Sequence, residues 1–184
     1  MSVPEYTLVR SRRRTLAIQV TAAGEVILRC PMGLPKKTAE QFLAAKKPWV
    51  EEKLRSLRTR PVYPKLTEAE IQEMRREALP FLRQRAEVYA PLAGVTFGKL
   101  SVRAQRTRWG SCNQRGDLSF NCLLMLAPPE VIDYVVVHEL CHIRQMNHGP
   151  RFWAAVEEVL PDFRGPRAWL RENGGGLMAR LPGR

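Results

Sequence analysis

The segment Tyr134-Val-Val-Val-His-Glu-Leu-Cys-His142 determines how the rest of this 184-residue sequence is interpreted. Its two histidines are four residues apart, so on a helix both imidazoles lie on one face, within reach of a single metal ion. The apolar run before them indicates a helix that is buried against a core. Pro129, as a first helical residue, is expected to begin this helix, which should continue to about Met146.

Zinc is the metal that this pattern predicts, because neutral imidazole nitrogens bind it tetrahedrally and leave one position open for water. Glu139 lies one step round the helix from His138, where it can take a proton from that water rather than bind the metal. We therefore expect one Zn²⁺ per chain, with His138 and His142 as ligands and Glu139 as the catalytic general base. The predicted activity is that of a zinc-dependent hydrolase.

A third ligand is expected from the turn that follows the helix. His148 lies beyond the helix end, and Asn147-His-Gly-Pro150 has the turn chemistry to swing its ring back toward the first two. The chain contains three histidines in all, and all of them fall between positions 138 and 148. A carboxylate of Glu157 or Glu158 on the following helix is the alternative third ligand.

Two strands are predicted upstream, at residues 100–105 and 118–122. The connection between them, residues 106–116, is polar and contains two glycines. Long polar loops of this kind often carry functional residues. The candidates for the substrate cleft lie in or beside this loop: Arg108, Trp109, Ser111 and Asn121.

Two small residues of this loop remain open to two interpretations. Ser111 and Cys112 either line the cleft or belong to a simple turn with a packed thiol. Neither is a nucleophile, because no histidine is left over to activate one. The nearby Arg103, Arg106 and Arg108 either bind an anionic group or are solvated.

Further helices are expected around these elements. Thr67 and Glu70 have the spacing of a capping box at the start of a long amphipathic helix that ends near residues 91–94. Other helices are predicted at 150–160 and around 166–172, before a glycine-rich tail. The pattern predicts an α+β fold, in which a small, mostly antiparallel sheet packs against the metal-binding helix and further helices.

The N-terminal part, residues 1–60, is basic, with 13 basic and 5 acidic residues. Three short strands at 6–10, 16–20 and 25–29 are expected to form an antiparallel β-meander, followed by helices over 38–58 that are interrupted at Pro48. Residues 58–64 are expected to be a linker. The predicted organisation is an N-terminal domain over 1–60 and a catalytic domain over 61–184, or one continuous domain.

The composition of the chain indicates where the protein is located and what kind of partner it could bind. No stretch approaches the roughly 20 apolar residues of a membrane span, and the first residues lack a secretory signal, so a cytoplasmic location without membrane attachment is expected. The four cysteines lack CxxC spacing and are expected to be reduced. The net charge of +12 suits a nucleic-acid partner bound through a basic surface, or a basic surface that is simply solvated.

The chain resembles the YgjP-like metallopeptidases, relatives of the SprT-like and WLM zinc peptidases. Three segments carry the resemblance: Arg108-Trp-Gly-Ser-Cys112, residues 129–142, and Asn147-His-Gly-Pro-Arg-Phe-Trp153. They cover about residues 100–165, and the N-terminal part resembles the family more loosely. The resemblance implies a zincin-like fold, zinc bound by His138, His142 and His148, Glu139 as general base, and a peptide or protein substrate.

Three functions from different classes are consistent with the sequence. The first is a metallopeptidase. The second is a DNA-associated protein, including a protease that acts on DNA-bound proteins, which requires DNA binding that weakens with salt. The third is a non-catalytic structural zinc domain, which requires four protein ligands and no open water position. The sequence predicts neither the oligomeric state nor the cleavage specificity.

Overall fold

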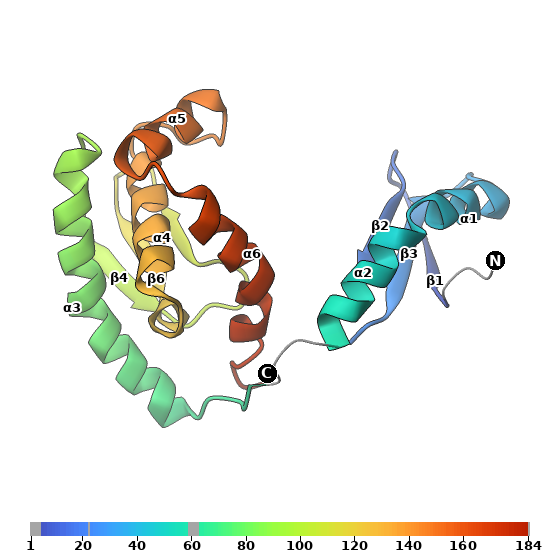
Figure 1. The fold of residues 1–184 in the computed structure, drawn as a ribbon, viewed down its shortest axis with the longest axis horizontal. Helices are drawn as coiled ribbons and strands as arrows, with labels where there is room; N and C mark the ends of the chain where they lie inside the picture. Colours follow the sequence, from blue (N-terminus) through green and yellow to red (C-terminus); the bar gives the residue numbers. More distant parts are fainter. Residues whose placement is uncertain (1–4, 22, 59–62, 184) are drawn as a thin grey trace. The chain divides into compact units, whose positions relative to one another are not determined.

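The computed structural model describes residues 5–21, 23–58 and 63–183 (Figure 1). The chain forms two compact units, residues 1–61 and 62–184. The described residues form six α-helices and two three-stranded sheets, so the predicted α+β class is confirmed. Most of the expected linker at 58–64 lies outside the described residues.

The first unit holds one small sheet and two helices. Its elements are β1 (Thr7–Ser11), β2 (Ala17–Val20), β3 (Val26–Pro31), α1 (Lys36–Ala45) and α2 (Lys47–Arg58). The strand order is β1-β3-β2, with β1 parallel and β2 antiparallel to β3, so the predicted antiparallel meander is wrong. β3 takes the central place because its alternate residues Val26, Leu28 and Cys30 are all buried.

The second unit holds the other sheet and the remaining helices. Its elements are α3 (Glu68–Leu92), β4 (Leu100–Arg103), β5 (Gly110–Cys112), β6 (Leu118–Asn121), the 3₁₀ helix η1 (Cys122–Leu126), α4 (Pro129–Cys141), α5 (Pro150–Val159) and α6 (Arg164–Met178). The order is β4-β6-β5, with β4 parallel and β5 antiparallel to β6. The expectation of a mostly antiparallel sheet is therefore wrong, because each sheet has one parallel and one antiparallel pair.

The capping box predicted at the start of α3 is confirmed. The backbone amide of Glu70 donates to the Thr67 hydroxyl at 3.2 Å, and the backbone amide of Thr67 donates to the Glu70 carboxylate at 2.7 Å. These two bonds satisfy donors that a helix N-terminus would otherwise leave unpaired. They set the start of the long helix that flanks α4.

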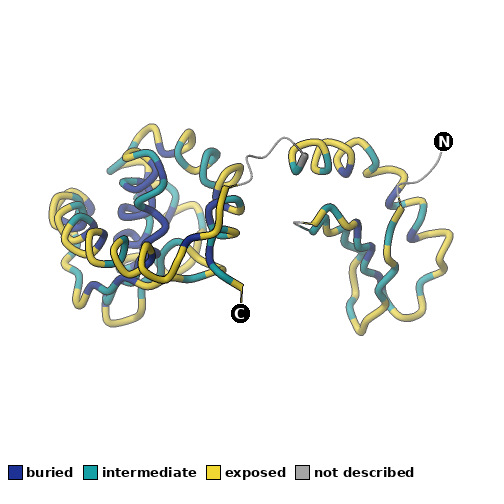
Figure 2. Tube along the Cα trace, turned by 90° about the horizontal axis from the view of Figure 1, so that it is seen from below, coloured by how far each residue is buried: buried dark blue, intermediate teal, exposed yellow. Residues whose placement is uncertain are grey.

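Helix α4 is the central element of the second unit and lies between α3 and α6 (Figure 1). Its run from Val135 to Val137 is buried, as are Leu140 and Cys141, so the helix is enclosed on most sides (Figure 2). The helix ends at Cys141, and residues 142–144 form a turn. The expected continuation to Met146 is wrong.

Helix α6 is longer than the sequence suggests, because it continues through Gly174-Gly-Gly176. Glycine disfavours helix by about 1 kcal/mol relative to alanine, so the sequence favours a glycine-rich tail here. That expectation is wrong because tertiary packing holds the segment. Gly174 is buried against the indole of Trp109, and a Cβ at this position would lie 3.1 Å from two of its ring atoms.

None of the helices in the described parts of the chain is long and apolar enough to span a membrane.

Candidate metal centre

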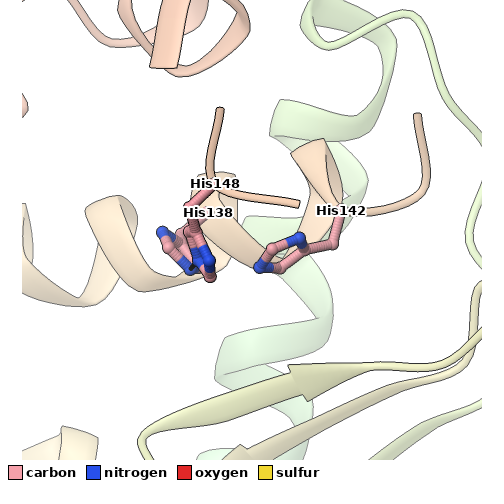
Figure 3. Close-up of side chains that lie close together, drawn as sticks. All are labelled: His138, His142 and His148. Atoms are coloured by element: carbon pink, nitrogen blue, oxygen red, sulfur yellow. Dashed lines mark hydrogen bonds between the residues drawn. The ribbon is translucent and has the colours of Figure 1, made fainter. Parts of the chain in front are cut away.

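The three histidines converge at one end of α4 (Figure 3). His138 comes from the last turn of α4, His142 caps its C-terminus, and His148 comes from the loop before α5. One nitrogen from each ring lies within 4.8 Å of the others, and Nε2 of His138 is 3.0 Å from Nε2 of His148. The turn after α4 thus brings the third imidazole to the pair on the helix.

The end of α4 also fixes how the ring of His142 points. Its Nδ1 lies 3.0 Å from the backbone carbonyl oxygen of Gln145, which can only accept a hydrogen bond. Nδ1 therefore carries the proton, and Nε2 keeps its lone pair for a metal. Gln145, which supplies this carbonyl, directly follows the turn that ends the helix.

Two aromatic residues at the start of α5 support the cluster. The ring of Phe152 is fully buried, with its centroid 4.9, 4.5 and 4.7 Å from the centroids of His138, His142 and His148. The indole Nε1 of Trp153 donates to the backbone carbonyl of His148 at 3.1 Å. The signal in the sequence that could have revealed this role is their position, about one turn beyond the third histidine.

The charge state of the cluster suits a metal. Burial, reinforced by the neighbouring His142 and His148, lowers the pKa of His138 to about 3, and burial also lowers the pKa of His142. Both rings are therefore neutral at pH 7, the form that binds metal ions. Nδ1 of His138 is buried with no hydrogen-bond partner among the described residues. Three imidazoles are a donor set that fits zinc.

Glu139 lies beside the cluster in a confined position. Its side chain is 5% exposed, and burial raises its pKa to about 8, although the charge of Arg108 acts in the opposite direction. A Cβ added to Gly110 would lie 2.6 Å from both Cγ and Oε1 of Glu139. The carboxyl group thus rests directly on the backbone of β5, at a point where only glycine leaves room.

A comparison with protein families identifies the chain. A family model described as YgjP-like, metallopeptidase domain, matches residues 14–74 and 64–173. The chain belongs to the YgjP-like family. This confirms the resemblance seen in the sequence, and it makes the protein a metal-dependent peptidase that acts on peptide or protein substrates.

A solved structure gives a further comparison. The chain is similar to the crystal structure of the metallopeptidase zymogen of Pyrococcus abyssi abylysin, with 21% sequence identity and a TM-score of 0.45. The similarity covers 50% of this chain and 92% of that one. A search of curated proteins found no match.

The residues expected to line the cleft of this YgjP-like chain occupy different environments. Asn121 is 1% exposed; its amide nitrogen donates to the carbonyls of Gln105 and Arg108 at 2.6 and 3.0 Å. Asn121 is therefore buried, and its side chain holds the loop in place. Trp109 packs against Gly174, so it joins the loop to α6.

The two other cleft candidates, Arg108 and Ser111, flank Trp109 and Gly110 in the sequence. Successive side chains of a strand point to opposite faces, so Ser111 points away from the face on which Gly110 meets Glu139. Arg108 precedes β5 and acts electrostatically on Glu139. Of the four cleft candidates, Arg108 is the one with a described interaction with the predicted general base.

The alternative ligands are outside the histidine cluster, and the thiols near it are protonated. Glu157 is exposed and its carboxylate is 2.6 Å from Arg164, and Glu158 is also exposed. The candidate metal-binding group found among the described residues consists of the three histidines. Burial raises the pKa of Cys112 and of Cys141 to about 11, so both thiols are protonated at pH 7. All four cysteines are free.

The contact between Gly110 and Glu139 leads to a first prediction. Gly110→Ala is expected to displace the Glu139 carboxyl group, because the new Cβ needs the space that this group occupies. A displacement of about 1 Å can lower a rate about 100-fold, so kcat/KM should fall by roughly that factor. Metal content, measured by plasma mass spectrometry, should stay at the wild-type level.

Gly165→Ala is the matched control, because no atom lies within 4 Å of its added Cβ. Equal activity in both variants would contradict the prediction.

Proposed function

We propose that this YgjP-like protein is a zinc metallopeptidase in which His138, His142 and His148 hold one Zn²⁺ and Glu139 is the general base. The main support is the convergence of three imidazole nitrogens within 4.8 Å at the end of a buried helix. The helix that carries His138 and is capped by His142 also supplies the buried carboxyl group between them in sequence. In this proposal residues 62–184 are a zincin-like catalytic domain.

The zinc ion and the protein contribute different parts of the proposed reaction. When bound, the zinc ion supplies a Lewis acid that polarises the scissile carbonyl and brings the pKa of water close to 7. Glu139 takes the proton from the attacking water and later delivers it to the leaving amine. Burial raises the pKa of this carboxyl group, and the positive charge of a bound Zn²⁺ would favour the ionised form that accepts the proton.

The number of ligands favours catalysis over a structural role. A structural zinc site normally has four protein ligands, whereas a catalytic site has three and leaves a position for water. The metal-binding group found in the described parts of the chain has three members. The backbone carbonyl of Gln145 and the buried ring of Phe152 hold the ligands in place, as expected for a preorganised site.

Removal and return of the metal tests this proposal. Dialysis against a chelator should remove zinc and abolish cleavage of a mixture of peptides, read as new N-termini by mass spectrometry. One equivalent of Zn²⁺ per chain should restore both the cleavage and the metal content, whereas Mg²⁺, which prefers oxygen ligands, should restore neither. Cleavage that persists after metal analysis shows no bound ion would refute the zinc mechanism.

A further inference from the structure

A second polar site lies on the side of the β4-β6-β5 sheet that faces away from α4. It is a groove of about 790 Å³ lined mainly by charged and polar side chains from the three strands and the β4–β5 loop. The buried residues Leu118 and Phe120 of β6 point to the core, so the intervening Ser119 points into the groove. Since Gly110 meets Glu139 on the core side, strand β5 separates the groove from the general base.

Three serines form a row across the middle of this groove. Ser119 of β6 is in register with Ser101 of β4 on one side and with Ser111 of β5 on the other. Neighbouring strands are about 4.8 Å apart, so the three hydroxyls form a short row, in which that of Ser101 donates to the backbone carbonyl of Leu118 at 3.4 Å. The Ser119 hydroxyl oxygen is buried and has no hydrogen-bond partner among the described residues.

Basic residues flank the serine row at both ends. Arg103 and Arg108 line the groove at the C-terminal end of β4, and Lys99 lines it at the other end. None of these three makes a salt bridge within the described parts of the chain. Lys99 and Arg103 are four residues apart on an extended strand, which places their backbones about 13 Å apart.

The single acid of the lining, Asp117, is already used by the protein. Its carboxylate accepts hydrogen bonds from the backbone amide of Lys99 at 2.8 Å and from the side-chain amide of Asn113 at 3.0 Å. These bonds lower the pKa of Asp117 and keep the carboxylate in the turn between β5 and β6. The groove therefore offers hydroxyl and amide donors between separated positive charges. Its one carboxylate, that of Asp117, is already hydrogen-bonded within the protein.

We propose that this groove binds the phosphate backbone of a nucleic-acid strand. Separated cations match a chain of negative charges better than a single ion, and Arg, Lys, Ser, Asn and Gln side chains are the usual partners of phosphate oxygens. The lining contains no aromatic side chain on which a base could stack, so the groove contacts the phosphates, which carry no sequence information. The net charge of +12 favours such a partner over the basic segment of a protein. The proposal does not depend on peptidase activity.

Fluorescence anisotropy with labelled oligonucleotides of about 16 nucleotides, single-stranded and duplex, tests the groove. The wild-type chain should bind mixed sequences equally, with affinity that falls from 50 to 200 mM salt. Lys99→Ala/Arg103→Ala should weaken binding at least tenfold and make the slope of log K against log [salt] shallower by about 1.4 for a single strand. Ser119→Ala should weaken binding severalfold and leave this slope unchanged, because no charge is lost.

The matched control is Lys53→Ala/Arg83→Ala, which removes the same charge from exposed positions on α2 and α3. This control should bind as the wild type does. Equal losses in the two double variants would overturn the proposal, because binding would then follow overall charge. Absence of binding at low salt would also overturn it, as would equally tight, groove-dependent binding of polyglutamate, which would assign the groove to acidic polypeptides. If the double variant fails to fold, Ser119→Ala and Arg103→Gln take its place, and wild-type binding by both would overturn the proposal.

Discussion

Replacing Glu139 with Gln is expected to lower kcat/KM by a factor of about 10² to 10⁴ while the protein keeps its metal. Gln has the shape of Glu, so it fits the space that Gly110 leaves. The amide cannot accept the proton of the attacking water, which removes the general base without removing a ligand. Cleavage rates and zinc content, measured on the same samples, separate the two effects.

The control for Glu139→Gln is Glu158→Gln on α5. Glu158 is exposed and is one of the alternative ligands that the sequence allows, so its replacement changes one carboxylate without touching the histidine cluster. We expect wild-type activity and metal content in this control. Full activity in Glu139→Gln would show that Glu139 is not the general base. Loss of zinc from Glu158→Gln would indicate that the Glu158 carboxylate is a metal ligand.

Replacing His142 with Ala is expected to abolish stable metal binding. Zinc at 1,000 times its Kd stabilises the fold by about 4 kcal/mol. A unit of the size of residues 62–184 gains roughly 4 °C in Tm per kcal/mol, so a chelator should lower the Tm of this unit by about 15 °C. The Tm of His142→Ala should not respond to the chelator, since no metal is left to remove. Differential scanning calorimetry gives both values.

Gln145→Ala is the control for this experiment. The contact between Gln145 and His142 uses the backbone carbonyl, so the side chain can be removed while the hydrogen bond stays. This variant should bind zinc and respond to the chelator as the wild type does. A chelator-induced fall in the Tm of His142→Ala as large as that of the wild type would remove His142 from the set of ligands.

Sequence periodicity predicts the parts of the fold that depend on local spacing. Two histidines four residues apart must share a helix face, and Thr67 and Glu70 at capping-box spacing mark the start of α3 whatever surrounds them. The apolar run of α4 predicts its burial for the same reason. These features need no knowledge of distant parts of the chain.

The features that the sequence does not reveal depend on contacts between distant residues. Strand β5 has three residues and begins with glycine, so it lacks the alternation that reveals a strand, and its pairing with β6 defines it. The three glycines of α6 are helical because Trp109 packs against Gly174. The early end of α4 is accompanied by the contact between the Gln145 carbonyl and His142. The burial of Asn121 is a feature of the same kind, because its hydrogen bonds to the loop leave no trace in the sequence.

The two halves of the proposed site differ in how far apart their parts lie along the chain. The three histidines fall between positions 138 and 148, so their cluster needs only α4 and the turn after it. The position of Glu139 depends on Gly110, which belongs to a strand that must first pair with β6. Closing a short loop costs less entropy than pairing distant strands, so we expect metal uptake to precede catalytic competence during folding.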